Sequence, residues 1–118
     1  MKIHIQKESN AISSKSLRAG ASIVDISPEE GIELAGYPHY PRHNTGIHDP
    51  LYASCLFLDD GQIELAIVAM DLAMYSKAYV RSLRNRISQQ TDIPGPNIMV
   101  CASHTHSGPW ASGRLDFE

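Results

Sequence analysis

The fold is decided by residues 51–70, LYASCLFLDDGQIELAIVAM. Two apolar runs, residues 51–58 and 62–70, flank Asp59-Asp60-Gly61, and an Asp-Gly pair between such runs is a strong signal for a tight turn. The stretch therefore predicts an antiparallel β-hairpin. Residues 65–70 are so densely apolar that we expect the second strand to be covered on both faces.

A strand–helix–strand unit is predicted to begin with the second strand of this hairpin. Within residues 75–90, Val80, Leu83 and Ile87 recur at helical spacing, and the run Pro94-Gly95-Pro96 ends the pattern. Residues 97–102 then predict another strand. A helical crossover of this kind joins parallel strands, so strands 62–70 and 97–102 are expected to be parallel neighbours.

Three segments precede the hairpin. Residues 1–17 are polar, and we expect a mobile N-terminal segment that could include a short strand at residues 2–6. Residues 18–26 contain a β-branched run and predict a strand that ends at Ser27-Pro28. Residues 28–50, rich in Pro, Gly, Tyr and His, predict a long loop. Loops of this length in compact domains are usually functional.

The composition is that of an ordinary globular domain. The 118 residues are 42% hydrophobic and 19% charged, with a formal net charge of −3, which gives no support to nucleic-acid binding. No apolar run reaches the ~18 residues that a membrane span needs. The N-terminus lacks the apolar core of a signal peptide, so we expect a cytoplasmic protein. The one basic cluster is interpreted as a solvated helix face rather than a phosphate-binding patch: Arg81, Arg84 and Arg86.

The two cysteines, Cys55 and Cys101, both fall within expected strands. Buried free thiols are the favoured interpretation, and a disulfide between neighbouring strands is the alternative. Their number and spacing do not resemble the cysteine framework of a small secreted protein.

The strongest functional signal is residues 103–109, SHTHSGP, directly after the apolar run at 98–102. In extended backbone, residues i and i+2 point to the same face, so His104 and His106 are predicted to present two imidazoles to one pocket at a strand tip. Two polar residues hydrogen-bonded at a strand end are the simpler alternative. A zinc hydrolase usually has three protein ligands and a water, so this pair alone leaves such a site incomplete.

A carboxylate is expected near this pair. Asp71 ends the strand at 62–70, so it lies at the same sheet edge as His104 if the two strands are parallel. An Asp at a strand end can equally be a cap for the next element.

The loop at residues 28–50 supplies further candidates. His48 directly precedes a strand and could reach the same pocket, while Gly36 and Gly46 would let backbone approach a ligand closely. The alternative is a glycine-rich loop in which Asp49 acts only as a cap. Two further histidines of the loop are expected to be exposed: His39 and His43.

Three motifs, taken in order, resemble the N-terminal part of the neutral/alkaline (non-lysosomal) ceramidase family. They are AGASIVDISP at residues 19–28, AGY at 35–37 with GIHDPLYA at 46–53, and SHTHSGP at 103–109. The similarity extends from about Arg18 to Trp110. Members of this family are zinc-dependent amidases that cleave the N-acyl bond of ceramide. The resemblance therefore implies Zn²⁺ as cofactor and a lipid amide such as ceramide as substrate.

The resemblance also implies roles for individual residues. His104 corresponds to the first zinc ligand of the family, and His106 to a second histidine that assists without ligating. Gly36 and His48 correspond to pocket-lining positions. We accordingly assign metal binding to His104 and catalytic roles to His106 and His48. Substrate binding is assigned to three residues: Gly36, Gly46 and Asp71.

The expected architecture is α/β (mixed), a β-hairpin plus a β-α-β crossover that form part of a larger mixed-sheet α/β hydrolase domain. Residues 18–118 would be the N-terminal portion of that catalytic domain. The other zinc ligands of the family, a His, a Glu and a Tyr, come from later segments. We therefore expect a fragment or truncated member, inactive as this chain alone. Its uncovered strand faces would be covered by the missing C-terminal part of the protein or by self-association with a second copy of the chain.

Two other functions stay open. An amidohydrolase barrel also carries a His-x-His motif after its first strand, but residues 1–97 precede the strand here and show no barrel pattern. The other alternative is a non-catalytic domain that keeps the fold without the metal.

Overall fold

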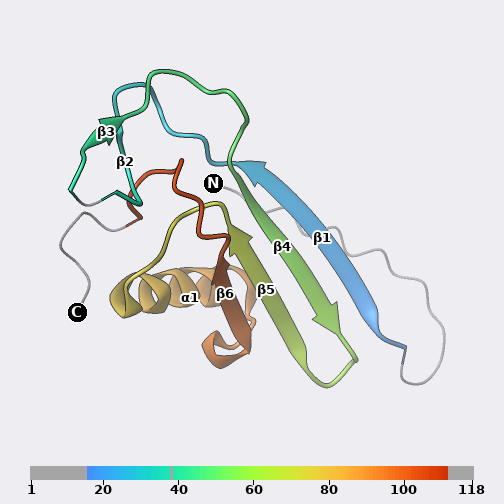
Figure 1. The fold of residues 1–118 in the computed structure, drawn as a ribbon. Helices are drawn as coiled ribbons and strands as arrows, with labels where there is room; N and C mark the ends of the chain where they lie inside the picture. The colour runs from blue at the N-terminus through green and yellow to red at the C-terminus, as the bar shows by residue number, and fades with distance from the viewer. Residues whose placement is uncertain (1–15, 38, 112–118) are drawn as a thin grey trace.

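The computed structural model describes residues 16–37 and 39–111 and contains a mixed four-stranded sheet (Figure 1). Its strands are β1 (Arg18–Asp25), β4 (Tyr52–Asp59), β5 (Glu64–Met70) and β6 (Ile98–Ala102), in the order β1-β4-β5-β6. The first three are antiparallel neighbours, whereas β5 and β6 are parallel. The expected mixed α/β fold is therefore confirmed, with one hairpin and one crossover.

The predicted hairpin forms between β4 and β5, with Asp59 paired to Glu64. An Asp60 carboxylate oxygen accepts hydrogen bonds from the backbone N–H groups of Gln62 and Ile63, at 2.9 and 2.7 Å. These bonds hold Gln62 and Ile63 in the turn, so β5 begins two residues later than the apolar pattern predicts. Gly61, with φ of 85°, adopts a conformation that suits glycine.

The predicted crossover is α1 (Lys77–Thr91), followed by the short 3₁₀ helix η1 (Gly95–Asn97) and then β6. Ser76 caps α1, because its side-chain oxygen accepts from the backbone N–H of Tyr79 at 3.1 Å. This cap explains why the helix begins at Lys77 rather than at residue 75.

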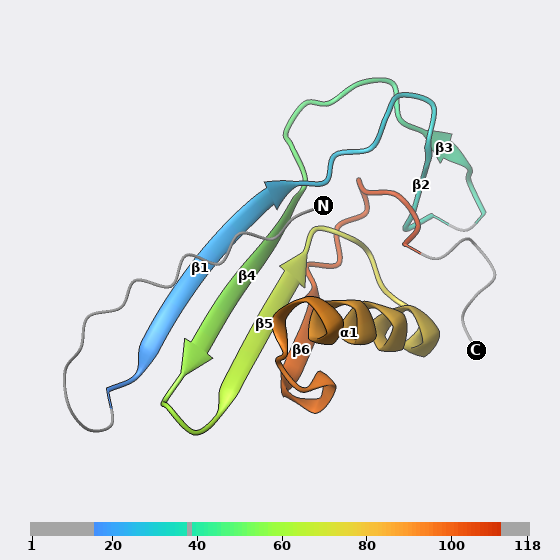
Figure 2. The same cartoon turned by 180° about the vertical axis from the view of Figure 1, so that it is seen from behind.

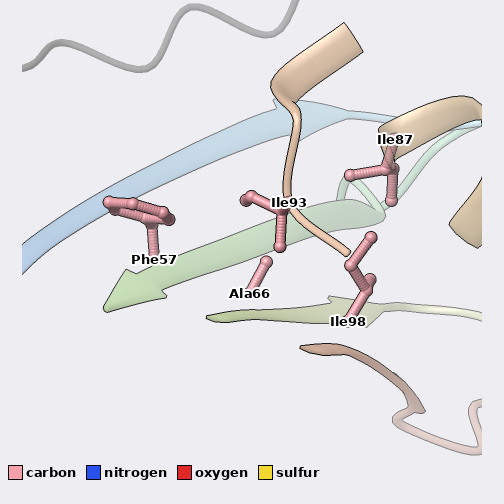
Figure 3. Close-up of a cluster of buried hydrophobic side chains, with 5 residues drawn as sticks. All are labelled: Phe57, Ala66, Ile87, Ile93 and Ile98. Atoms are coloured by element: carbon pink, nitrogen blue, oxygen red, sulfur yellow. The ribbon is translucent and has the colours of Figure 1, made fainter. Parts of the chain in front are cut away.

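The hydrophobic core lies between α1 and one face of β4, β5 and β6. Figure 2 shows α1 lying across β5 and β6. Ile93 and Ile98 are 1% and 0% exposed, and both belong to the cluster drawn in Figure 3. Its members come from the sheet, from α1 and from the connection that follows α1: Phe57, Ala66, Ile87, Ile93 and Ile98.

The opposite face of the sheet is uncovered within the described residues. Ile23, Leu56 and Met99 are 64%, 40% and 56% exposed, and a shallow apolar groove runs between β1, β4 and β5. The expectation that β5 is covered on both faces is therefore wrong for this part of the chain, since Ala69 on the open face is exposed. An open apolar face agrees with the expected uncovered strand surfaces, and self-association through it stays a prediction.

The loop at residues 28–50 is more ordered than the sequence predicts. It contains a small antiparallel pair, β2 (Glu33–Leu34) and β3 (Arg42–His43). The buried side chain of Asn44 supports it, donating to the carbonyls of Pro28 and Glu29, both at 3.1 Å. These bonds hold the loop in an ordered conformation beside the sheet.

Several expectations meet the structure only in part. The predicted strand at residues 2–6 and most of the expected mobile segment lie outside the described residues. Cys55 and Cys101 are free, because β5 separates their strands and two strand spacings exceed the reach of a disulfide.

Among the described helices none has the length and apolar character of a membrane span.

An ion pair at the base of β1 predicts acid sensitivity. The backbone N–H of Gly61 and the guanidinium of Arg18 both donate to the Asp59 carboxylate, and these bonds lower the pKa of Asp59. A folded-state pKa below the unfolded value means that unfolding takes up a proton as pH falls. The contribution is present above the unfolded-state pKa of about 4 and is lost progressively as the pH falls through the lower folded-state value.

Asp59→Asn should therefore lower the free energy of unfolding at neutral pH and flatten its decline from about pH 5 to pH 3. Urea unfolding across this pH range is the measurement. The flattening will be partial, because hydrogen bonds also lower the pKa values of Asp25 and Asp60. An unchanged acid slope in the variant would contradict the prediction.

Candidate functional site

The candidate site lies where β5 and β6 end side by side. Because the two strands are parallel, the segment after β6 pairs with the segment after β5. The backbone N–H of Ser103 donates to the carbonyl of Met70, and that of His104 to the carbonyl of Leu72, both at 3.1 Å. The strand-tip position predicted for the His-x-His motif is therefore what the structure shows.

The two imidazoles lie close together, but not because the backbone of the motif is extended, as the sequence predicts. β6 ends at Ala102, and His104 has a φ of 61°, in the left-handed region that residues with a side chain rarely adopt. The motif is thus a turn rather than extended backbone. This turn brings Nε2 of His106 to 3.3 Å from Nε2 of His104, with ring centroids 5.0 Å apart.

The hydrogen bonds decide the tautomers of this pair. Nδ1 of His104 lies 2.7 Å from the carbonyl oxygen of Ala73, which can only accept, so Nδ1 carries the hydrogen. In a neutral His104, Nε2 then presents a lone pair. His106 must donate to it through Nε2–H, which leaves the lone pair of His106 on Nδ1.

Gly36 lies against the ring of His106. A Cβ on Gly36 would come within 2.5 Å of Cγ of His106, and the φ of Gly36 is 105°. Its segment is joined to the motif by a hydrogen bond from the Ala35 N–H to the Gly108 carbonyl, at 2.8 Å, and by a bridge between Leu34 and Pro109. The structure therefore brings Gly36 together with the histidine pair, and its substrate-binding role stays a prediction.

Aromatic and cationic side chains complete this corner. Tyr37 meets His106 edge-on, with ring centroids 5.3 Å apart. The Arg42 guanidinium lies over the Tyr37 ring, 4.4 Å from its centroid, and donates to the carbonyls of Ala35 and His106. Sequence reasoning missed Arg42, because its partners are backbone oxygens, one of them 64 residues away.

Tyr75 supports the strand ends from the helix side. Its hydroxyl donates to the carbonyl of Cys101 at 2.8 Å and approaches that of Met70 at 3.3 Å. Burial, with a smaller effect from Tyr79, raises the pKa of Tyr75 to about 12. The phenol therefore remains a donor at neutral pH and holds β5 and β6 together below the site.

Asp71 lies at the predicted sheet edge but makes a structural contact. Its carboxylate accepts from the backbone N–H of Tyr52 at 2.9 Å, and its own N–H donates to the Tyr52 carbonyl. Asp71 thus ties the end of β5 to the start of β4. These bonds go back to β4 and not forward to the next element, so they are not the cap considered as the alternative, and a substrate-binding role stays a prediction.

The remaining loop candidates lie on the surface. The His48 side chain is 98% exposed and contacts the carboxylate of Asp49 at 2.7 Å. Gly46 has a φ of 144°, and a Cβ there would meet nothing within 4 Å. The catalytic role of His48 and the substrate role of Gly46 stay predictions. Two histidines are exposed as expected, His39 and His43.

Within residues 16–37 and 39–111, no group of three or more His, Cys, Asp or Glu side chains is arranged to hold a metal ion. Among these described residues, the donor set at the strand tips is the histidine pair. Of the two rings, His104 has its Nδ1–H already bound to a carbonyl, the arrangement usual for a metal-ligating histidine.

Two solved structures are similar to this chain. Neutral ceramidase from Pseudomonas aeruginosa matches 83% of it with a TM-score of 0.70 and 28% sequence identity. A ceramidase complexed with C2 matches 82%, with a TM-score of 0.67 and 28% identity. This chain spans only 16% of either protein. No family model and no curated protein sequence matches it.

The predicted resemblance to neutral ceramidase is therefore confirmed for this part of that protein. The four-stranded sheet, its helix and the small β2–β3 pair correspond to a fragment of a larger domain.

Proposed function

We propose that this chain forms one wall of a zinc-dependent amidase site that cleaves the N-acyl bond of ceramide-like lipids. The observation that carries the proposal is the Nδ1–H of His104 bound to the Ala73 carbonyl, which directs a lone pair on Nε2 toward the strand-tip corner. The similarity to neutral ceramidase supports the same chemistry.

The imidazole donors described above could supply part of the ligand set of a zinc ion. Imidazole nitrogen is a common zinc ligand, and the backbone carbonyl behind His104 fixes its tautomer and ring orientation. When bound, zinc would activate a water and polarise the amide carbonyl. The further ligands come from polypeptide outside the described residues, in keeping with the 16% of neutral ceramidase that this chain spans.

His106 acts beside the metal ligand in this proposal. Once the His104 lone pair is engaged elsewhere, the Nε2–H of His106 is released from it and can donate to the amide oxygen or to the leaving amine. Contact with Gly36 and the edge of Tyr37 holds the ring in place. His48 is proposed to assist, and Gly46 and Asp71 to line the substrate path.

The test uses the complete product of the gene that encodes this chain, with a fluorescent N-acylsphingosine as substrate. We expect release of the fatty acid that stops with a chelator and returns when zinc is added. The 118-residue chain alone should bind zinc weakly and show no turnover, because one imidazole holds zinc poorly against water. Zinc-loaded complete protein that cleaves no N-acyl amide would overturn the proposal.

A further inference from the structure

Arg42 contacts several groups of the site, although no pattern in the sequence indicates a role for it. Its Nη2 donates to the carbonyl of His106, and to that of Ala35 at 3.2 Å, while the guanidinium plane covers Tyr37. These contacts join β3 to both segments that surround the His106 ring. The segment at 35–37 supplies Gly36 and Tyr37, and the segment after β6 supplies the histidine itself.

The side-chain type matters at this position. Arginine keeps its charge at all ordinary pH values, carries several donors in a planar fork and stacks on aromatic rings. A lysine ammonium could supply the charge and bind the two carbonyls, but it has no planar group to cover the Tyr37 ring. Both hydrogen bonds of Arg42 come from Nη2 and its planar face covers Tyr37, whereas its buried Nε has no hydrogen-bond partner among the described residues.

His106 needs such support more than His104 does. The ring of His104 is bound directly to the Ala73 carbonyl on the α1 side of the site. The ring of His106 has its one hydrogen bond to His104 and otherwise contacts the 36–37 segment. Movement of that segment relative to the motif would therefore displace His106 and leave His104 in place.

We propose that Arg42 is a positioning residue for His106, holding its backbone and the Tyr37 ring so that the imidazole stays beside His104. The inference rests on the proposed amidase function for its kinetic consequence. Its structural part, the placement of His106, can be measured without any activity.

The experiment compares Arg42→Met and Arg42→Lys in the complete protein with isotope-labelled histidine and tyrosine. Arg86→Met, at an exposed position of α1, is the matched control. We expect Arg42→Met to lose the nuclear Overhauser contact between Tyr37 and His106 and to lower kcat on the order of tenfold, with little change in KM. Arg42→Lys should fall between it and the wild type, and the hydrogen-bonded Nδ1–H signal of His104 should persist in every variant.

The two hypotheses fail in different ways. A folded Arg42→Met variant that keeps the Tyr37–His106 contact overturns the positioning role, whatever its activity. Loss of the contact in a protein that never cleaves an N-acyl bond supports the positioning role and overturns the amidase function. If Arg42→Met does not fold, Arg42→Lys decides, because full retention of both contact and kcat would overturn the need for the guanidinium plane over Tyr37.

Discussion

His104→Ala is expected to lower amidase activity by at least about a thousandfold and to remove zinc from the complete protein. The Nδ1–H of this imidazole is held by the Ala73 carbonyl, which leaves Nε2 as the nitrogen that would bind the metal. Loss of an outer partner of a metal ligand typically costs about 10–100-fold in affinity or activity, and loss of the ligand itself costs more. Zinc content after dialysis and kcat/KM for an N-acylsphingosine are the measurements.

The controls for this result come from other histidines of the chain. His39→Ala, in an exposed loop position, should retain both zinc and activity. His106→Ala should retain zinc and lose kcat by about 100-fold, as expected for removal of a proton donor. A His104→Ala protein that still carries one zinc per chain would place the metal elsewhere.

The main sheet could be predicted because its signals are local. The Asp-Gly turn between two apolar runs indicates the β4–β5 hairpin, and the spacing of Val80, Leu83 and Ile87 indicates α1. The parallel pairing of β5 and β6 then follows from the crossover. The strand-tip position of the His-x-His motif is a consequence of these elements alone.

The interior of the site could not be predicted in the same way. The left-handed φ of His104 accompanies hydrogen bonds to the segment after β5, and no spacing within residues 103–109 reveals these bonds. The two-residue strands β2 and β3 are too short for a periodic signal, and it is their pairing that carries Arg42 to the site. Contacts made through backbone carbonyls leave no side-chain pattern for sequence reasoning to find.

The exposed faces show a second limit of sequence reasoning. An apolar run such as residues 65–70 indicates that both faces of a strand are meant to be covered, but not by which polypeptide. In the described residues α1 covers one face, and Ile23, Leu56 and Met99 remain exposed on the other. The open face is consistent with the match of these residues to a fragment of a larger domain.

Gly36→Ala should combine a loss of stability with a loss of catalysis. The added Cβ would lie 2.5 Å from Cγ and 2.9 Å from Nδ1 of His106, which is too close for either group to stay in place. The φ of 105° adds backbone strain, so we expect a cost of about 1–3 kcal/mol in the free energy of unfolding. Displacing the His106 ring by about 1 Å should lower kcat by about 100-fold. Urea unfolding and steady-state kinetics measure the two effects.

Gly31→Ala separates the two causes, because Gly31 has a φ of 88° but a Cβ there would meet nothing within 4 Å. It should lose stability through backbone strain while its kcat stays that of the wild type. The excess loss in Gly36→Ala then measures the contact with His106 alone. Equal stabilities and equal kcat values in the two variants would mean that the His106 ring moves aside without a cost in free energy or in catalysis. Its position against Gly36 would then have no part in the chemistry of the site.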